Sequence, residues 1–144
     1  MPSTGWDRAS FAASLAGLAI TVYLSVQHYV AAIPLACSSS GMVNCERVLT
    51  SAYAAVLGLP VAVWGAAWFA GAAPLSFLSA ARAAASWPRY LTLGWVAVGA
   101  AVVLRLVYVE LAVIGSICLW CTAVHVLVIG IFVIEVLAAS GSGR

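Results

Sequence analysis

The sequence contains no lysine, and charged residues of all kinds make up only 7% of its 144 positions. The net charge of +2 comes from a few scattered arginines. A chain with so few cations lacks the basic patch that a nucleic-acid-binding surface requires. The scarcity of charge, together with a hydrophobic share of 65%, also excludes an ordinary soluble globular domain. The sequence therefore predicts a membrane protein.

Long apolar runs are what the chain has in place of charge, and each is long enough to cross a bilayer as a helix. We expect an all-α membrane protein, a bundle of four transmembrane helices forming a single domain over residues 1–144. The expected spans cover about residues 9–35, 59–78, 90–113 and 114–137, joined by a cysteine-containing loop at 37–57 and a second polar loop at 81–89. The first run is too long for the apolar region of a signal peptide.

The arginines indicate the orientation of the bundle. With the N-terminus in the cytoplasm, one arginine lies in the outer loop, and four lie on the cytoplasmic side: Arg8, Arg82, Arg89 and Arg144. The opposite orientation reverses this ratio and violates the positive-inside rule. Residues 81–89 are therefore expected to form a cytoplasmic loop. The loop at 37–57 and the start of the fourth span then share the outer, oxidising side, where disulfide chemistry is possible.

Four cysteines form two pairs at this outer end, Cys37 with Cys45 in the loop and Cys118 with Cys121 at the start of the last span. Two thiols three residues apart lie on one helix face, and the amide groups of a helix N-terminus favour a thiolate. Two such pairs can pass electrons by thiol–disulfide exchange. A Cys₄ zinc site in a non-enzymatic membrane scaffold is the structural alternative, although zinc sites more often use two short Cys-x₂₋₄-Cys units.

Other side chains are candidates for a ligand pocket beside Cys118 and Cys121, which we call the inner pair. His125 lies one helical turn after Cys121 on the same face, where it can donate a hydrogen bond or a proton to a quinone oxygen. An ionisable side chain within a span is a functional candidate, although a histidine satisfied by a neighbouring helix is as good an interpretation. Trp120 and Tyr53 are candidates for an aromatic wall, but interfacial belts use the same residue types.

The arrangement resembles the vitamin K epoxide reductase family, and in particular its stand-alone prokaryotic members. The resemblance covers nearly the whole chain and rests on three features together: Cys37-x₇-Cys45, the Ser51–Tyr53 segment leading into Leu57–Pro60, and the Cys118–Cys121 motif at the fourth span. It implies a four-helix bundle around a quinone, with an outer cysteine loop and a short interfacial helix, expected within 52–57.

Residue roles follow from the resemblance by position. It implies that Cys37 exchanges with a thioredoxin-fold partner, that Cys45 relays electrons to Cys118, and that Cys121 faces the quinone and reduces it. Ser51 matches a serine or threonine that supports the site by hydrogen bonding. His125 matches a tyrosine that contacts the ligand in animal members.

The expected function is that of a membrane thiol oxidase with a quinone, either menaquinone or ubiquinone, as electron acceptor. We expect no fused thioredoxin-like domain, and therefore a separate DsbA-like oxidoreductase of the periplasm or cell exterior as partner. The lysine-free, alanine-rich composition fits a GC-rich bacterial genome better than an animal one, and we expect the protein in the bacterial cytoplasmic (inner) membrane. Vitamin K quinone or epoxide reduction is the alternative activity. It is less favoured because the asparagine that contacts the ligand in animal members has no counterpart outside the cysteine loop, where Asn44 lies.

Overall fold

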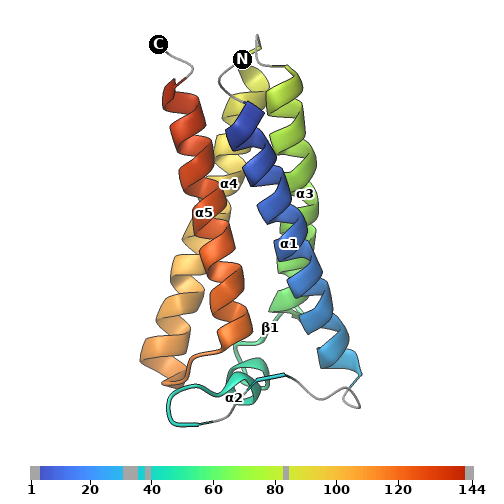
Figure 1. Cartoon of the computed structure of the whole chain (residues 1–144). Helices are drawn as coiled ribbons and strands as arrows, with labels where there is room; N and C mark the ends of the chain where they lie inside the picture. Colours follow the sequence, from blue (N-terminus) through green and yellow to red (C-terminus); the bar gives the residue numbers. More distant parts are fainter. Residues whose placement is uncertain (1–3, 31–35, 38–39, 83–84, 142–144) are drawn as a thin grey trace.

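A computed structural model shows a bundle of four long helices with the cysteine loop at one end (Figure 1). The structure describes residues 4–30, 36–37, 40–82 and 85–141. The long helices are α1 (Thr4–Tyr29), α3 (Val61–Ala81), α4 (Trp87–Tyr108) and α5 (Leu119–Gly141). A six-residue π-helix, η1 (Val109–Ile114), continues α4 toward the cysteine loop. The loop itself contains helix α2 (Cys45–Leu49) and strands β1 (Ala55–Val56) and β2 (Leu59–Pro60).

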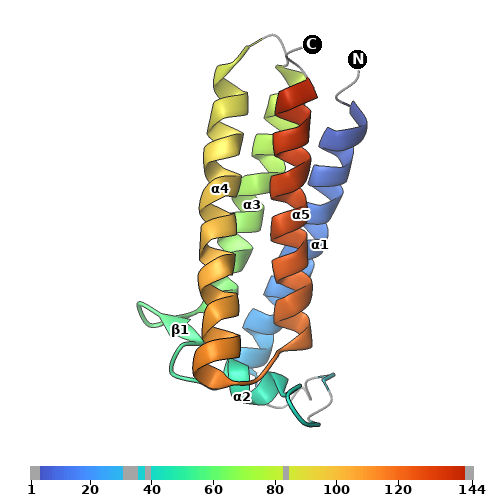
Figure 2. The ribbon, with the colours of Figure 1, turned by 90° about the vertical axis from the view of Figure 1, so that its left-hand side faces the viewer.

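The long helices are apolar enough to cross a membrane, and the described part of the chain holds four of them. Their outward faces carry large exposed side chains such as Phe77, Leu104 and Val126, as expected for helices solvated by lipid. The helices lie nearly parallel to one another along the length of the bundle (Figure 2). The chain is therefore a multi-pass membrane protein, and the all-α fold expected from the sequence is confirmed.

Small residues allow the helices to approach closely. Gly17 of α1 lies against the ring of Phe69 in α3, and a methyl group at position 17 would overlap that ring. Between α3 and α4, the indole nitrogens of Trp68 and Trp95 each donate to the other residue's carbonyl, at 3.2 and 3.1 Å. Phe69 and the side chains around it form the bundle's apolar core.

A buried polar cluster joins all four long helices at the end of the bundle remote from the cysteines. Glu135 of α5 is fully buried, and its Oε1 accepts hydrogen bonds from Ser10 of α1 at 2.7 Å and from Ser76 of α3 at 2.9 Å. Its Oε2 accepts from Arg89 of α4 at 3.0 Å. Arg89 also lies 3.9 Å from Asp7 of α1. We call these five residues the Glu135 cluster.

The helix boundaries differ from those expected from the sequence. The first helix covers 4–29 rather than 9–35, and residues 31–35 lie outside the described residues. The third begins at Trp87 because Pro88 fits the first turn of a helix, where no amide donor is needed. Its helical path continues through η1 to Ile114, and the second helix runs from 61 to 81 rather than from 59 to 78.

The last helix begins at Leu119, five residues later than expected. Gly115 adopts a left-handed conformation with φ 68° and ends η1. Ile117 then pairs with the cysteine loop, donating to the carbonyl of Met42 at 2.7 Å and accepting from the amide of Asn44 at 3.0 Å. This pairing keeps residues 115–118 out of the helix.

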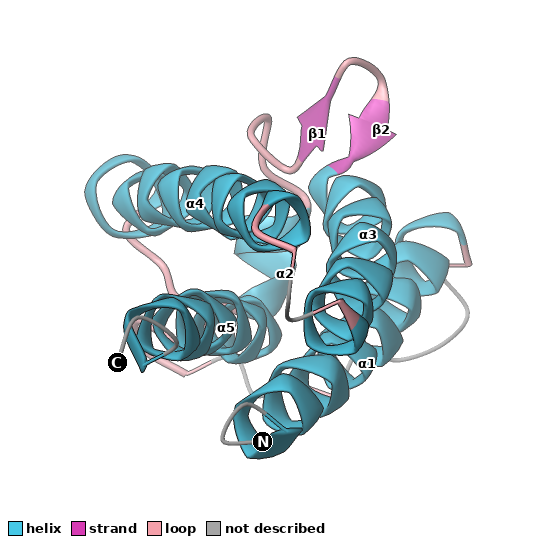
Figure 3. Cartoon of the chain, turned by 90° about the horizontal axis from the view of Figure 1, so that it is seen from above, coloured by secondary structure: helices cyan, strands magenta, loops and turns pink. Residues whose placement is uncertain are grey.

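The expectation of a short helix within 52–57 was wrong. The short helix is α2, which begins at Cys45 and is capped by Asn44, whose side chain accepts from the Arg47 amide at 2.9 Å. Residues 55–60 instead form an antiparallel hairpin, with Val56 opposite Leu59. Both turn residues, Leu57 and Gly58, have positive φ, which suits the tight turn of a two-residue hairpin. The hairpin lies beside α3 and α4 (Figure 3), at the end of the bundle that carries the cysteine loop (Figure 1).

Candidate active site

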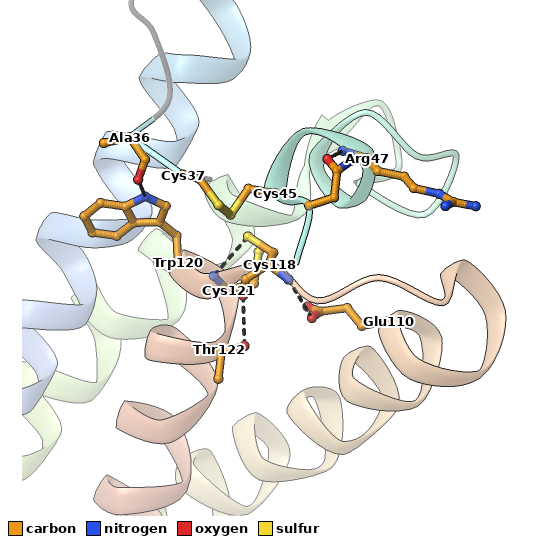
Figure 4. Close-up of a disulfide and its surroundings, with 10 residues drawn as sticks. Ala36, Cys37, Cys45, Arg47, Glu110, Cys118, Trp120, Cys121 and Thr122 are labelled. Atoms are coloured by element: carbon orange, nitrogen blue, oxygen red, sulfur yellow. Dashed lines mark hydrogen bonds between the residues drawn. A yellow bond between two sulfur atoms is a disulfide. The ribbon is translucent and has the colours of Figure 1, made fainter. Parts of the chain in front are cut away.

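The four cysteines meet at one end of the bundle (Figure 4). Cys37 and Cys45 are joined by a disulfide, whereas Cys118 and Cys121 are free thiols. Cys45 is 1% exposed and packs with fully buried Cys118 in one apolar cluster, against which Cys37 and Cys121 also pack. Residues separated by more than seventy positions in the sequence thus form one group of sulfur atoms.

The inner pair lies where the backbone favours a thiolate on Cys118. The amide of Cys121 donates to the Cys118 sulfur at 3.2 Å. The pKa of Cys118 is lowered, first by a hydrogen bond from the Cys121 side chain and further by backbone amides, although burial opposes the shift. Thr122 donates from both its amide and its hydroxyl to the Cys118 carbonyl, each at 2.8 Å, and so fixes the first turn of α5.

A cavity of about 870 Å³ lies between the inner pair and the four long helices. Cys121 and the Cys37–Cys45 disulfide lie on its wall, and most of the remaining wall is apolar, with Phe69, Val103 and Val128 among its side chains. Pockets of this size and character typically hold a small organic ligand. The cavity therefore brings the free thiol of Cys121 next to a space suited to an apolar molecule.

Three of the candidates expected from the sequence also line this cavity. His125 is buried in the wall on the α5 side, and Tyr53 lies in the segment between α2 and β1. Ser51 lies on the wall as well, and its hydroxyl donates to the Val48 carbonyl at 2.8 Å. That bond ties Ser51 to the end of α2, the helix that carries Cys45.

Trp120 lies elsewhere, outside the residues that line the cavity. Its indole nitrogen donates to the carbonyl of Ala36 at 3.1 Å, and its ring packs against Tyr23 with centroids 5.2 Å apart. On α5, Cys121 is four residues before His125 and shares its face. Trp120 is five residues before His125, so its side chain points to a different side of the helix. Its observed contacts hold the residue next to Cys37 against the start of α5.

Comparison with known protein families supplies the identification. The family model described as the vitamin K epoxide reductase family matches residues 8–136, nearly the whole chain. The chain belongs to this family. Membership makes the protein an oxidoreductase of the membrane thiol–disulfide and quinone type. Members of the family generally use a quinone as electron acceptor and work with a thioredoxin-fold partner.

The cavity fits a quinone of the kind that the family uses. A quinone ring needs an apolar slot with hydrogen-bond donors for its oxygens. The side-chain nitrogen of Gln27 is buried in the part of the chain that the structure describes and has no hydrogen-bond partner there. Gln27 lines the cavity, and so does His125, which offers a second polar nitrogen. A buried donor without a partner is costly, and a ligand oxygen would satisfy it.

Sequence reasoning missed the site roles of Gln27 and Glu110. Both stand out in the sequence as polar residues inside apolar runs, which is a general signal of function in a membrane span. That signal did not indicate which other residues Gln27 and Glu110 lie close to. The structure shows that both side chains reach the cavity wall from different helical segments, α1 and η1.

Proposed function

We propose that the protein is a membrane thiol oxidase. It takes electrons from a reduced thioredoxin-fold, DsbA-like partner, passes them through its two cysteine pairs and delivers them to membrane quinone, thereby supporting disulfide formation in exported proteins. The carrying observation is one cluster that contains all four cysteines, three of which, Cys37, Cys45 and Cys121, lie on the wall of an apolar cavity. Thiol–disulfide exchange between the two cysteine pairs and electron transfer to a ligand in the cavity then need only short movements of the cysteine side chains.

The first step takes place at the loop disulfide. Cys37 is half-buried while Cys45 is almost fully buried, so a soluble partner reaches the Cys37 sulfur more easily. A partner thiolate attacks Cys37, and the Cys37–Cys45 bond breaks with Cys45 leaving as a thiolate. The partner's second thiol then displaces Cys37. The partner leaves with a disulfide, and the loop pair gains two electrons.

The second step transfers those electrons to the inner pair. Cys45 attacks Cys118 of a Cys118–Cys121 disulfide, and Cys121 leaves. Cys37 then attacks Cys45, which restores the loop disulfide and releases Cys118. Cys118 is a good leaving group because its pKa is lowered by the hydrogen bond from Cys121. The product has a closed loop disulfide and two inner thiols, the state that the structure contains.

The third step returns the inner pair to a disulfide. A bound quinone takes up two electrons and two protons. Cys121 lies on the cavity wall and Cys118 does not, which supports Cys121 as the residue that faces the acceptor. Gln27 and His125 would hold the acceptor's oxygens, and Phe69 and its apolar neighbours would exclude water.

The arginine distribution supports a location in the bacterial cytoplasmic membrane with the cysteines on the outer face. Arg8 lies near the start of α1, Arg82 follows the end of α3 and Arg89 lies near the start of α4, all remote from the cysteines, whereas Arg47 lies in α2 beside Cys45 (Figure 4). Under the positive-inside rule, this distribution supports cytoplasmic termini.

Turnover by purified protein in lipid tests the proposed function. We expect Cys118→Ser and Cys121→Ser each to abolish reduction of quinone by a small dithiol, since neither can form the inner disulfide. Cys37→Ser should block turnover with a thioredoxin-fold partner and leave turnover with the small dithiol. If Cys37→Ser changes neither activity, the role assigned to Cys37 is wrong.

The same preparation separates the alternatives. Substituting vitamin K epoxide for quinone in the assay shows whether epoxide is a substrate. One zinc ion per chain with no redox-active disulfide would instead indicate a metal-stabilised scaffold. The Cys37–Cys45 disulfide favours the oxidase, because it occupies two of the four thiolates that a Cys₄ site needs.

A further inference from the structure

Glu110 is a buried carboxylate in the wall of the cavity, only 7% exposed. It is the second residue of η1, the π-helix that ends at Gly115. Its backbone carbonyl accepts from the amide of Ser116 at 3.1 Å, which folds the chain back toward Cys118. π-Helical turns are rare and occur frequently at functional sites.

The side chain of Glu110 extends from the inner cysteine pair to His125. Oε2 accepts a hydrogen bond from the amide of Cys118 at 3.4 Å. Oε1 lies 4.0 Å from Nε2 of His125. One carboxylate thus connects the redox pair with the imidazole on the cavity wall, and hydrogen bonds of catalytic groups often tighten from such separations once a ligand binds.

Glu110 differs from Glu135, a buried carboxylate of α5 at the other end of the bundle. Glu135 is bonded by Ser10, Ser76 and Arg89, which is what a structural carboxylate in a membrane requires. Among the described residues, Glu110 has no arginine partner within ion-pair distance. Its partners are the Cys118 amide and His125. A buried carboxylate held this way is costly for stability, so a role in the reaction explains it better than packing does.

We propose that Glu110 is a proton-relay residue between the inner cysteine pair and His125. The inference rests on the proposed function. Because Cys118 is favoured as a thiolate, forming one disulfide from Cys118 and the Cys121 thiol releases two electrons and one proton. Reducing a quinone to its quinol takes up two electrons and two protons, so the second proton comes from solvent. Glu110 accepts a proton released by the pair and passes it to Nε2 of His125, while His125 gives a proton to the acceptor oxygen. Both residues end each turnover with the charge they began with.

The remaining titratable side chains on the cavity wall are less well placed for this role. His28 of α1, Glu46 of α2 and Tyr53 are exposed residues of the loop side. The α3 helix contributes no titratable side chain to the described wall. Glu110 and His125 are the buried acid–base pair there.

The variant Glu110→Gln tests the relay, since an amide oxygen still accepts from the Cys118 amide but cannot carry a proton. General acid–base groups contribute roughly 10²–10⁴-fold to a rate, so we expect kcat for dithiol-driven quinone reduction to fall about 10²-fold with KM for quinone nearly unchanged. Protons must then come from solvent, so kcat should decline as pH rises over about pH 6 to 8, and the solvent deuterium isotope effect should increase. Glu110→Asp should recover part of the rate.

Glu135→Gln is the matched control, because it makes the same change in a buried carboxylate at the other end of the bundle. It should keep the wild-type pH profile and isotope effect. A Glu110→Gln protein with wild-type kcat and pH profile, or with only a raised quinone KM, overturns the relay. Should Glu110→Gln not fold, Glu110→Asp carries the test through kcat, because its shorter side chain moves the carboxylate away from His125, and a wild-type kcat there also overturns the relay. Failure of wild-type protein to reduce quinone would instead contradict the proposed function.

Discussion

Cys118 is the residue at which the two cysteine pairs meet. It is fully buried, packs with Cys45 and receives a hydrogen bond from the Cys121 amide. Its lowered pKa comes first from the Cys121 side chain, so the two inner cysteines have different roles. Cys118 is stabilised as a thiolate, and Cys121 is the donor that stabilises it.

Replacing Cys121 by alanine should therefore raise the pKa of Cys118. With the loop disulfide intact, Cys118 is the remaining free thiol in this variant, so its ionisation can be followed by thiolate absorbance near 240 nm. We expect the wild-type protein to show a thiolate at a pH below the titration of Cys121→Ala. Cys118→Ala supplies the control, in which the early thiolate should be missing. Identical titrations in wild type and Cys121→Ala would contradict the hydrogen-bond assignment.

At the residue scale, spacing predicted more than composition did. The Cys-x-x-Cys spacing and the one-turn offset to His125 are local, so a helix alone brings these residues to one face. Glu110 meets Cys118 only because η1 and Gly115 turn the chain back, and no periodicity in the sequence indicates that turn. Trp120 was placed in the pocket by residue type, but its contacts are with Ala36 and Tyr23.

The turn between η1 and α5 is the element that positions both Glu110 and Cys118. Gly115 has a left-handed backbone, and its amide bonds the carbonyl of Glu110. Space is not the constraint, since nothing lies within 4 Å of the position that a Cβ would occupy. The requirement for glycine is therefore conformational.

Gly115→Ala should destabilise the protein by about 1–2 kcal/mol, the usual cost of a left-handed conformation for an L-residue. It should also slow turnover, because the strain shifts Cys118 relative to Cys45. Gly94→Ala is a suitable control, since Gly94 is a helical residue of α4 with open space around it. Unfolding in mixed detergent micelles measures the stability of both variants, and dithiol-driven quinone reduction measures their turnover. Equal stability for the two variants would argue against a conformational role for Gly115.

At the element scale, the four spans were predictable because apolar length is a strong signal. The structure of the cysteine loop was less predictable. Its short helix begins at Cys45 because Asn44 caps it, a local signal that the sequence already contains. The segment 55–60 forms a hairpin through Leu57, a non-glycine residue with φ 53° that is rare in such turns.

The described part of the molecule has a buried polar cluster at one end of an apolar bundle and the cysteine cluster at the other end. The Glu135 cluster links every long helix at one end, and the cysteines and cavity occupy the other. A bundle that contains an open cavity loses packing there, so firm contacts at the remote end help to keep the helices aligned. The cluster is absent from the sequence prediction because its members are far apart in the chain.

Glu135→Ala should destabilise the bundle strongly. It removes the partner of Arg89, and breaking a buried ion pair on one side typically costs about 3–5 kcal/mol. Glu46→Ala, at an exposed carboxylate, should change stability by no more than about 0.5 kcal/mol. Unfolding in mixed micelles gives the comparison. A Glu135→Ala protein as stable as wild type would show that the cluster does not hold the helices together.

A single-turnover count of quinol tests the electron path most directly. Fully reduced protein in lipid carries four thiols, which form two disulfides, so mixing it with excess quinone without oxygen should yield two quinols per chain. The double variant Cys37→Ser with Cys45→Ser should yield one, and Cys121→Ser should yield none, because the loop pair has no route to the acceptor except through the inner pair. A yield of one quinol from Cys121→Ser would contradict the proposed electron path, since the loop cysteines would then reduce quinone directly.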